Sequence, residues 1–417
     1  MPTPRVLVSD KLSEAAVKIF KDRGIEVDYL PDLGKDKDAL LEAIPKYDGL
    51  AIRSATKVTP KIIAAASRLK VIGRAGIGVD NVDIPAASQR GIVVMNTPFG
   101  NAITTAEHAI SMMMALARQI PEANASTHAG KWEKNRFMGV ELCNKTLGVI
   151  GCGNIGSIVA DRAIGLKMKV VAFDPFLSPE RALDLGVEKV ELDDIFRRSD
   201  FITLHTPLTD KTRNIVNADS LAKCKKGVRI INCARGGLVN EDALLEALKS
   251  KHVAGAALDV FEVEPATSHP LFGMENVVAT PHLGASTNEA QENVALQVAE
   301  QMADFLMTGA VTNALNMPSI SADEAPRLRP YVELANKLGR FVGQLTDAAI
   351  TDVVIEYAGD VGEMNTRALT SAALAGVLQA QLGTVNMVSA PIAAKERGIK
   401  VDEVKQTQRG AYGTYIR

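Results

Sequence analysis

The stretch that decides the fold is KTLGVIGCGNIGSIVADRAIGLKMKVVAFD, residues 145–174. Its short apolar run at 147–150 predicts a buried parallel strand. Gly151, Gly153 and Gly156 follow with the spacing G-x-G-x-x-G, where a helical pattern begins. A second apolar strand at 169–173 ends in Asp174. This order is typical of a dinucleotide-binding βαβ unit, because the glycines let the backbone approach a pyrophosphate and the helix N-terminus points N–H groups at it.

Asp174 indicates which dinucleotide is bound. It lies at the end of the second strand, eighteen residues past Gly156, where a carboxylate would accept hydrogen bonds from the adenine ribose hydroxyls. The same charge would repel the 2′-phosphate of NADP, so we expect NAD as the cofactor. A glycine-rich turn with no ligand would explain the glycines alone, but not two flanking strands of which the second ends in an aspartate.

Composition and charge indicate an ordinary globular enzyme. At 417 residues the chain exceeds what one hydrophobic core usually serves, so two or three domains are expected. Its 47 Lys and Arg against 49 Asp and Glu give a net charge of −2, which offers no support for nucleic acid or a membrane surface as a partner. The four cysteines have no paired C-x-x-C spacing, so we expect reduced thiols and no metal site. Since no leader or long apolar run is present, the expected location is the cytoplasm.

The first hundred residues alternate strand and helix. Such alternation predicts a parallel sheet covered on both faces, which makes a doubly wound α/β domain of its own, without a dinucleotide fingerprint. The expected fold class is therefore α/β, with two doubly wound parallel-sheet domains of the Rossmann and flavodoxin-like type. The expected strands are 5–9, 25–30, 49–52, 69–72 and 92–95, and the expected helices are 14–23, 37–44 and 60–67.

Polar residues follow two strands of this first domain. Arg53 and Ser54 follow one strand, and Arg74 and Gly76 follow another. Ligands of open α/β sheets bind outside the carboxyl ends of the strands, and two arginines there could hold a carboxylate or a phosphate in bidentate fashion. Solvated loop charges are the alternative interpretation. Further on, a loop at 130–137 places the only tryptophan among basic residues, which fits either a subunit contact or a lid.

Later strands of the βαβ domain, at 201–205, 228–232 and 255–258, also end in polar chemistry. Thr206 could approach a bound cofactor, and Arg235, Glu264 and His282 follow successive strands. Any one of the three could serve the fold alone, but together they suit hydride transfer from an alcohol carbon. A histidine takes the hydroxyl proton, a carboxylate on its other ring nitrogen fixes the tautomer, and an arginine grips a substrate carboxylate.

In its motifs the chain resembles the D-2-hydroxyacid dehydrogenases. The resemblance rests on GCGNIG (151–156), NCARGG (232–237), AALDVFEVEP (256–265) and PHLGAST (281–287). Members of that family that oxidise phosphoglycerate are similar to this chain at RSATKVT (53–59), GRAGIGVDNVD (73–83), VMNTPFGN (94–101) and GKWEKNRFMG (130–139). The resemblance implies NAD-dependent oxidation of D-3-phosphoglycerate to 3-phosphohydroxypyruvate, the first step of L-serine biosynthesis. It also implies a cleft between two α/β domains and a homodimer or homotetramer.

The resemblance assigns roles to residues of this chain. Arg235, Glu264 and His282 would be catalytic. The residues that would line NAD are Ile77, Gly151, Gly153, Asn154, Ile155, Gly156, Asp174, Thr206, Cys233, Ala234, Asp259, His282, Gly284 and Ala285. The residues that would bind the substrate are Arg53, Ser54, Arg74, Gly76, Arg235 and His282, with Lys134 or Arg136 of a neighbouring subunit over the same cleft. Some relatives carry threonine in place of Ile77, so a hydroxyl contact is not implied there.

In that family the substrate domain is discontinuous. The expected domains are then a substrate-binding domain at 1–98 and 287–317, an NAD-binding domain at 99–286 and a C-terminal α+β regulatory domain at 318–417. A helix at 289–307 would return the chain to the first domain. Pro318, Pro326 and Pro330 predict a linker, followed by helices at 332–345 and 367–382 and a strand at 352–357.

The C-terminal part carries a resemblance of its own. VNMVSAPIAAKERGI (385–399) is similar to the intervening regulatory domain of longer family members, which finish with a serine-binding ACT domain. This chain stops in a strand-like stretch at 413–417, so we expect either a truncated or a natural short form.

Two other functions remain open at this point. Another D-2-hydroxyacid dehydrogenase, acting on glycerate, lactate or 2-hydroxyglutarate, would keep the same motifs, although the pair Arg53 and Arg74 favours a phosphate. A dinucleotide-sensing corepressor could also keep the set of Arg, Glu and His while serving as a binding platform.

Overall fold

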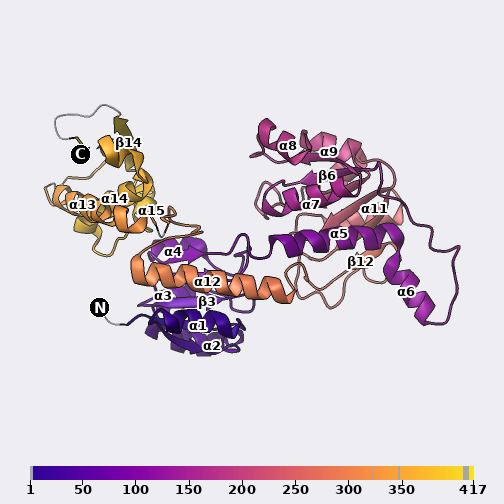
Figure 1. The fold of residues 1–417 in the computed structure, drawn as a ribbon, viewed down its shortest axis with the longest axis horizontal. Coiled ribbons are helices and arrows are strands. Elements are labelled where there is room, and N and C mark those ends of the chain that lie inside the picture. The colour runs from indigo at the N-terminus through magenta and orange to yellow at the C-terminus, as the bar shows by residue number, and fades with distance from the viewer. Residues whose placement is uncertain (1–2, 322, 346–347, 407–412) are drawn as a thin grey trace. The chain divides into compact units, whose positions relative to one another are not determined.

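Two parallel sheets organise the chain, one in each of two units (Figure 1). The computed structural model describes residues 3–321, 323–345, 348–406 and 413–417. One unit consists of Met1–Gly100 with Gln291–Arg417, and the other of Asn101–Ala290. Among the helices of the described residues, none is both long and apolar enough to cross a membrane.

The first unit begins with a five-stranded parallel sheet of order β2-β1-β3-β4-β5, which is the flavodoxin-like order. Its strands are β1 (Arg5–Val8), β2 (Glu26–Tyr29), β3 (Gly49–Ile52), β4 (Val71–Arg74) and β5 (Val93–Met95). Its helices are α1 (Glu14–Asp22), α2 (Lys37–Ala43), α3 (Pro60–Ala65) and α4 (Ile84–Gln89), with single 3₁₀ turns η1 (Leu33–Lys35) and η2 (Ile44–Lys46). The predicted doubly wound sheet is confirmed, although β4 begins two residues later than expected.

Helix α12 (Asn288–Thr308) supplies core side chains to this sheet. Val298 and Met302 are fully buried in one cluster with Val71 and Met95. A Cβ on Gly73 of β4 would collide with the Met302 sulfur and with Val298, so the helix lies directly on the strand. The helix expected at 289–307 therefore exists and packs on the first sheet.

The second unit contains a seven-stranded parallel sheet of order β12-β11-β10-β9-β6-β7-β8. Counted from β6, this is the Rossmann order extended by one strand, with the direction of winding reversing between β6 and β9. The strands are β6 (Thr146–Ile150), β7 (Lys169–Phe173), β8 (Glu188–Lys189), β9 (Phe201–Leu204), β10 (Val228–Asn232), β11 (Val253–Leu258) and β12 (Val277–Ala279). The helices are α5 (Ala102–Arg118), α6 (Ile120–His128), α7 (Asn154–Gly165), α8 (Pro179–Leu185), α9 (Leu192–Arg198), α10 (Ala218–Lys223) and α11 (Glu241–Lys249). The predicted βαβ unit β6-α7-β7 is confirmed.

The C-terminal part of the first unit is a small α+β arrangement. Its sheet has the order β14-β13-β15, in which β13 pairs parallel with β14 and antiparallel with β15. The elements are α13 (Ala325–Gly343), β13 (Asp352–Ala358), the 3₁₀ turn η3 (Gly359–Glu363), α14 (Thr366–Leu382), α15 (Ala390–Glu396), β14 (Lys400–Gln406) and β15 (Tyr415–Ile416). The strand expected near residue 415 is present, at an edge of the sheet.

The predicted proline linker is wrong for two of its three prolines. Pro326 lies in the first turn of α13 and Pro330 lies inside that helix, which begins at Ala325 instead of Val332. A proline in the first turn costs no hydrogen bond, whereas Pro330 removes one. Leu328 and Ala335 are buried in the same core as Tyr357, and this packing of the helix offsets the loss.

Candidate active site

The glycine-rich loop has the shape of a phosphate cradle. Gly151 follows β6 with φ of 90°, and a Cβ on Gly156 would collide with the carbonyl oxygen of Gly151. Gly153 is the N-cap of α7, no side chain caps that helix end, and a Cβ on Gly153 would meet no atom within 4 Å. There is therefore open space beside the positive end of the helix, where Asn154 and Ile155 form its first turn. The loop fits the pyrophosphate of a dinucleotide.

Asp174 lies beside this loop, as predicted. Its Oδ2 accepts a hydrogen bond from the Cys152 N–H at 2.8 Å, and its Oδ1 accepts one from the Phe176 N–H at 2.8 Å. The carboxylate is thus held at the end of β7, next to the glycines, where a ribose would lie. Burial, with the charge of Asp174, raises the pKa of the Cys152 thiol to about 11, so this cysteine is no nucleophile at neutral pH.

The ends of β9 and β10 lie next to the glycine-rich loop along the same edge of the sheet. The His205 N–H donates to the Ile150 carbonyl at 2.8 Å, which places Thr206 just beyond the end of β6. Burial lowers the pKa of His205 to about 4, so this imidazole is neutral at physiological pH. At the end of β10, burial also raises the pKa of the Cys233 thiol, so Cys233 offers its backbone rather than a thiolate.

Arg235 is positioned by an asparagine that sequence reasoning did not single out. The Asn232 side chain accepts a hydrogen bond from the Ala234 N–H at 3.1 Å and donates one to the Arg235 carbonyl at 2.9 Å. Arg235 Nη1 donates to the Ala234 carbonyl at 2.7 Å, and the side chain is half-buried. The turn after β10 is therefore fixed, with the guanidinium at the carboxyl edge of the sheet.

His282 and Glu264 form the predicted pair. His282 Nδ1 lies 2.7 Å from Glu264 Oε2, and Glu264 Oε1 accepts a hydrogen bond from the Phe261 N–H at 3.0 Å. Partial burial works against the charged carboxylate, but the bonds from His282 and from Phe261 hold the pKa of Glu264 below its ordinary value. Because Nδ1 donates to the carboxylate, the neutral imidazole has its lone pair on Nε2. That atom can accept a proton from a substrate.

The loop that carries His282 is anchored on Asp259. His282 has φ of 58°, and its N–H donates to the Asp259 carbonyl at 2.9 Å. The fully buried Asp259 carboxylate accepts the N–H groups of Leu283 and Gly284, at 2.7 and 2.8 Å, and the Thr280 hydroxyl at 2.6 Å. The left-handed backbone of His282 is thereby held in place.

His108 of α5 completes this anchor, with Nε2 at 3.2 Å from Asp259 Oδ1. Burial opposes ionisation of Asp259, but the bonds from His108, Thr280 and the backbone hold its pKa below the ordinary value. Asp259 was expected to line NAD. Its carboxylate is bound by groups of the fold, and its contact with a cofactor stays a prediction. Gly284 and Ala285 lie in the turn that it holds, and their contacts with a cofactor stay predictions.

In the first unit, Arg53 and Ser54 lie on a loop that is fixed from two sides. The buried Asp10 carboxylate accepts the Arg53 N–H at 2.6 Å and the Thr56 hydroxyl at 2.7 Å. The Asn81 amide donates to the carbonyls of Arg53 and Thr56 at 2.6 and 2.7 Å. Sequence reasoning missed Asp10 and Asn81, because their partners lie far along the chain.

Arg74 emerges beside that loop. Ile52, the last residue of β3, is paired with Arg74, so Arg53 and Arg74 leave neighbouring parallel strands at the same edge. The Gly76 N–H donates to Thr97 Oγ1 at 2.6 Å, and the Asn96 amide donates to the Ile77 carbonyl at 2.7 Å. The structure thus brings together the four substrate-binding candidates of the first unit, with Ile77 adjacent.

Lys134 and Arg136 lie elsewhere, on the exposed loop of the second unit that carries Trp132. Arg136 forms ion pairs with Glu133, at 2.9 Å, and with Glu275. Lys134 is exposed, and Trp132 is 87% exposed. Their predicted reach into a neighbouring subunit stays a prediction.

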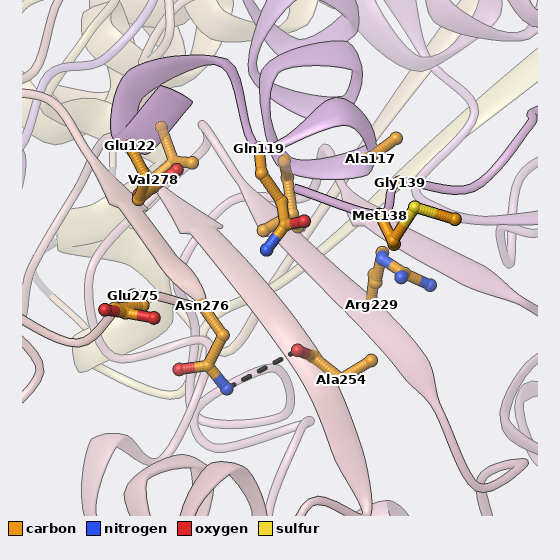
Figure 2. Close-up of a pocket in the computed structure, with 11 residues that line it drawn as sticks. Ala117, Gln119, Glu122, Met138, Gly139, Arg229, Ala254, Glu275, Asn276 and Val278 are labelled. Atoms are coloured by element: carbon orange, nitrogen blue, oxygen red, sulfur yellow. Dashed lines mark hydrogen bonds between the residues drawn. The ribbon is translucent and has the colours of Figure 1, made fainter. Parts of the chain in front are cut away.

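A small cavity in the second unit is unrelated to this chemistry. It holds about 80 Å³ and lies at the amino ends of the strands, where Arg229 is the second residue of β10, Ala254 is the second residue of β11 and Asn276 directly precedes β12 (Figure 2). The Asn276 amide points toward the Ala254 carbonyl, to which it donates at 3.4 Å. The cavity is too small for a dinucleotide, and it lies at the opposite edge of the sheet from His282.

Comparison with known proteins agrees with this geometry. The family model of the D-isomer specific 2-hydroxyacid dehydrogenase NAD binding domain matches residues 110–284, and that of the D-3-phosphoglycerate dehydrogenase intervening domain matches residues 327–417. The chain is 50% identical to D-3-phosphoglycerate dehydrogenase of Synechocystis over 403 residues, which cover 96% of this chain and 72% of that protein. It is 45% identical to the enzyme of the same name from Bacillus subtilis, over 99% of this chain and 78% of that protein.

A solved structure shares the fold over about three quarters of this chain. Aquifex aeolicus D-lactate dehydrogenase complexed with NAD and lactic acid is 26% identical, with a TM-score of 0.66, over 76% of this chain and 100% of that one.

Proposed function

This chain belongs to the D-3-phosphoglycerate dehydrogenases of the D-isomer specific 2-hydroxyacid dehydrogenase family, and we propose that Arg235, Glu264 and His282 perform its reaction. The reaction is the NAD-dependent oxidation of D-3-phosphoglycerate to 3-phosphohydroxypyruvate, the first step of L-serine biosynthesis. The observation that carries the proposal is the 2.7 Å contact between His282 Nδ1 and Glu264 Oε2, at the same edge of the sheet as the glycine-rich loop.

His282 is the general base of the proposed mechanism. NAD, which the glycine-rich loop and Asp174 would hold, would supply the acceptor for the hydride of the substrate C2 carbon. His282 Nε2 takes the proton of the C2 hydroxyl, so that the oxygen keeps the O–H electron pair and a carbonyl forms. Glu264 faces the resulting imidazolium through Nδ1 and stabilises its charge. In the reverse direction the same nitrogen returns the proton.

Arg235 is the proposed electrophilic group. A guanidinium can bind the substrate carboxylate with two parallel hydrogen bonds and polarise the neighbouring carbonyl oxygen. The turn fixed by Asn232 supports this role, because a guanidinium held in place needs no reorganisation during the reaction. For the cofactor, the proposed contacts are the glycine-rich loop with the pyrophosphate and Asp174 with the ribose.

Arg53 and Arg74 are the proposed phosphate ligands, with Ser54 and Gly76 beside them. Two cations at one sheet edge match a doubly charged phosphate, and the loop that carries Arg53 is held by Asp10 and Asn81. We further propose a homo-oligomer in which Lys134 or Arg136 of a neighbouring subunit adds to this charge. The exposed Trp132 on the same loop supports a subunit contact.

We also propose a cytoplasmic location and a regulatory role for the C-terminal part. All four cysteines are free, which suits a reducing compartment. The match of residues 327–417 to an intervening domain of phosphoglycerate dehydrogenase supports the second assignment.

A steady-state assay of the wild type tests the function as a whole. Initial rates of NAD reduction are measured with D-3-phosphoglycerate, D-glycerate, D-lactate and D-2-hydroxyglutarate. We expect the highest kcat/KM for phosphoglycerate. Equal kcat/KM for glycerate would contradict the phosphate assignment, and a lack of turnover with all four acids would favour a binding role.

A further inference from the structure

Glu241, the first residue of α11, holds the loop that carries Glu264 at two points. Its Oε1 accepts a hydrogen bond from the Glu262 N–H at 2.8 Å, and its Oε2 lies 2.8 Å from His269 Nε2. Glu264 lies between these two contacts in the sequence. The Glu241 side chain is 19% exposed and that of His269 is 13% exposed, so water competes little for these bonds. The carboxylate also lies at the N-terminus of its helix, where free N–H groups and the helix dipole attract an anion.

The hydrogen bonds of His269 fix its tautomer. His269 Nδ1 accepts from the Leu271 N–H at 3.2 Å, so Nδ1 carries a lone pair and the proton must be on Nε2. Nε2 can then donate only to Glu241. The neutral imidazole therefore satisfies both partners, and it lies against the Phe261 and Phe272 rings with centroid distances of 5.2 and 5.4 Å.

The other side of the loop is fixed by backbone contact. A Cβ on Gly236 would collide with the Phe261 carbonyl, so the turn that follows Arg235 lies directly against residues 261 and 262. Phe261 in turn donates its N–H to Glu264 Oε1 at 3.0 Å. The route from Glu241 to the catalytic pair thus runs through Glu262 and Phe261 to Glu264, and from there to His282.

We propose that Glu241 and His269 are positioning residues for the oxidation: together they hold the loop 261–269 so that Glu264 faces His282. The proposal rests on the proposed roles of Glu264 and His282, and it adds two residues that touch neither substrate nor cofactor. It explains why a hydrogen bond between a carboxylate and an imidazole closes this loop, where an apolar contact would serve stability as well.

The other ionisable groups around this loop have partners of their own. Glu262 pairs with Arg213 at 3.7 Å, and Asp259 pairs with His108 at 3.2 Å. Among the described residues, the loop also carries the pairs of Glu241 with His269 and of Glu264 with His282, and the turn that follows Arg235 packs against it. The charge of Asp259 also acts on the pKa of Glu264, so a Glu264→Gln background is needed to identify a change in the pH–rate profile that requires Glu264.

Two substitutions of His269 divide its hydrogen bonds. His269→Asn keeps an acceptor near the Nδ1 position for Leu271 but loses the bond to Glu241. His269→Gln keeps a donor near the Nε2 position and loses the acceptor. If the bond to Glu241 positions Glu264, His269→Asn and Glu241→Gln lower kcat by about 10-fold, as a small displacement of a reacting group does. They also move the acid limb of the pH–rate profile of phosphoglycerate oxidation to lower pH, whereas His269→Gln stays near the wild type.

The acid limb moves because a displaced Glu264 no longer stabilises the protonated His282. The shift should therefore vanish when His269→Asn is made in a Glu264→Gln background. Glu246→Gln on the same helix is the matched control, because the exposed side chain of Glu246 forms an ion pair with Lys249, at 2.8 Å. The thermal unfolding temperature of each variant is measured to verify that every protein is folded at the temperature of the assay.

Three outcomes would overturn the proposal. If the acid limb moves in Glu264→Gln but not in His269→Asn, then Glu241 and His269 have a structural role only. If His269→Asn moves the acid limb equally in the Glu264→Gln background, then Glu241 and His269 act by a route that does not involve Glu264. An unmoved limb in Glu264→Gln itself would remove Glu264 as the partner of His282, and the proposed function would then fail first.

Discussion

Oε2 of Glu264 lies 2.7 Å from Nδ1 of His282, and the second oxygen of Glu264 is held by the Phe261 N–H. Both oxygens of the carboxylate thus have a partner, and these two hydrogen bonds fix its orientation. Its pKa is held below the ordinary value, so it is charged throughout the range in which a histidine titrates. In the proposed mechanism, Glu264 therefore carries the charge that stabilises a protonated His282.

We expect Glu264→Gln to move the acid limb of the pH–rate profile to lower pH. A neutral amide stabilises the imidazolium less, so His282 loses its proton at a lower pH and the base is available there. The measurement is kcat/KM for phosphoglycerate from about pH 5 to 9. A limb at the wild-type position would show that Glu264 is not the partner of His282.

His282→Ala should lower kcat by roughly 10²–10⁴-fold, because general-base catalysis is typically worth that much. Binding of NAD, measured by calorimetry, should change little, since the glycine-rich loop and Asp174 are untouched. His128→Ala on α6 is a control for loss of an imidazole. Near-wild-type kcat in His282→Ala would remove this residue from the mechanism.

Asp259→Asn should destabilise the second unit by about 2–3 kcal/mol, because a buried carboxylate with several donors is replaced by an amide that turns N–H groups toward them. The folded-state pKa of Asp259 lies below the ordinary value, so its contribution is complete above about pH 4 and is lost as the pH falls through the folded-state pKa. The measurement is the urea midpoint of the variant and of the wild type, at pH 7 and at about pH 3. The difference between the two proteins should be smaller at the lower pH. Exposed Asp184→Asn should leave both midpoints unchanged.

Asp174→Ala should narrow the preference for NAD over NADP. The wild-type carboxylate would face the 2′-phosphate of NADP, and a like-charge contact of this kind costs enough to change kcat/KM by about 10-fold or more. The ratio of kcat/KM for the two cofactors measures the effect, with Asp161→Ala on the exposed face of α7 as the control. Comparable ratios in the wild type and in Asp174→Ala would contradict the ribose assignment.

The sequence predicts those parts of the fold that depend on short-range patterns of glycine and apolar residues. The glycines and apolar runs of β6-α7-β7 specify one supersecondary unit, and the expected strand ends carry Arg235, Glu264 and His282. The predicted start of α13 was wrong. The helix continues through Pro330 because Leu328 and Ala335 are buried, and no local pattern in the sequence shows that burial. Helix α6 was not expected either. It follows Gln119, whose left-handed backbone separates it from α5, and residues 120–128 have no clear apolar face.

The residues that hold the site were harder to predict than the site itself. Asp10 binds Arg53 from 43 positions away, and His269 meets Glu241 from 28 positions away. Such partners meet only in the folded chain, and a lone aspartate or histidine gives no signal of its own. Asp259 was singled out by its motif, but its bonds to Leu283 and Gly284 required the register of β11 with β12.

The last prediction concerns the phosphate. Arg53 and Arg74 leave adjacent strands at one edge, and the backbone of Arg53 is fixed by Asp10 and Asn81, so that Arg53→Ala removes a charge without releasing the loop. A lost charge-assisted contact with phosphate is worth about 1.5–3 kcal/mol. KM for phosphoglycerate should therefore rise by about 10-fold or more, whereas kcat/KM for unphosphorylated D-glycerate should change little. Arg68→Ala is the matched control, because Arg68 is a cation of the same unit that pairs with Asp48 at 2.9 Å. Equal losses on both substrates would reassign Arg53 to the carboxylate or to the structure of the loop.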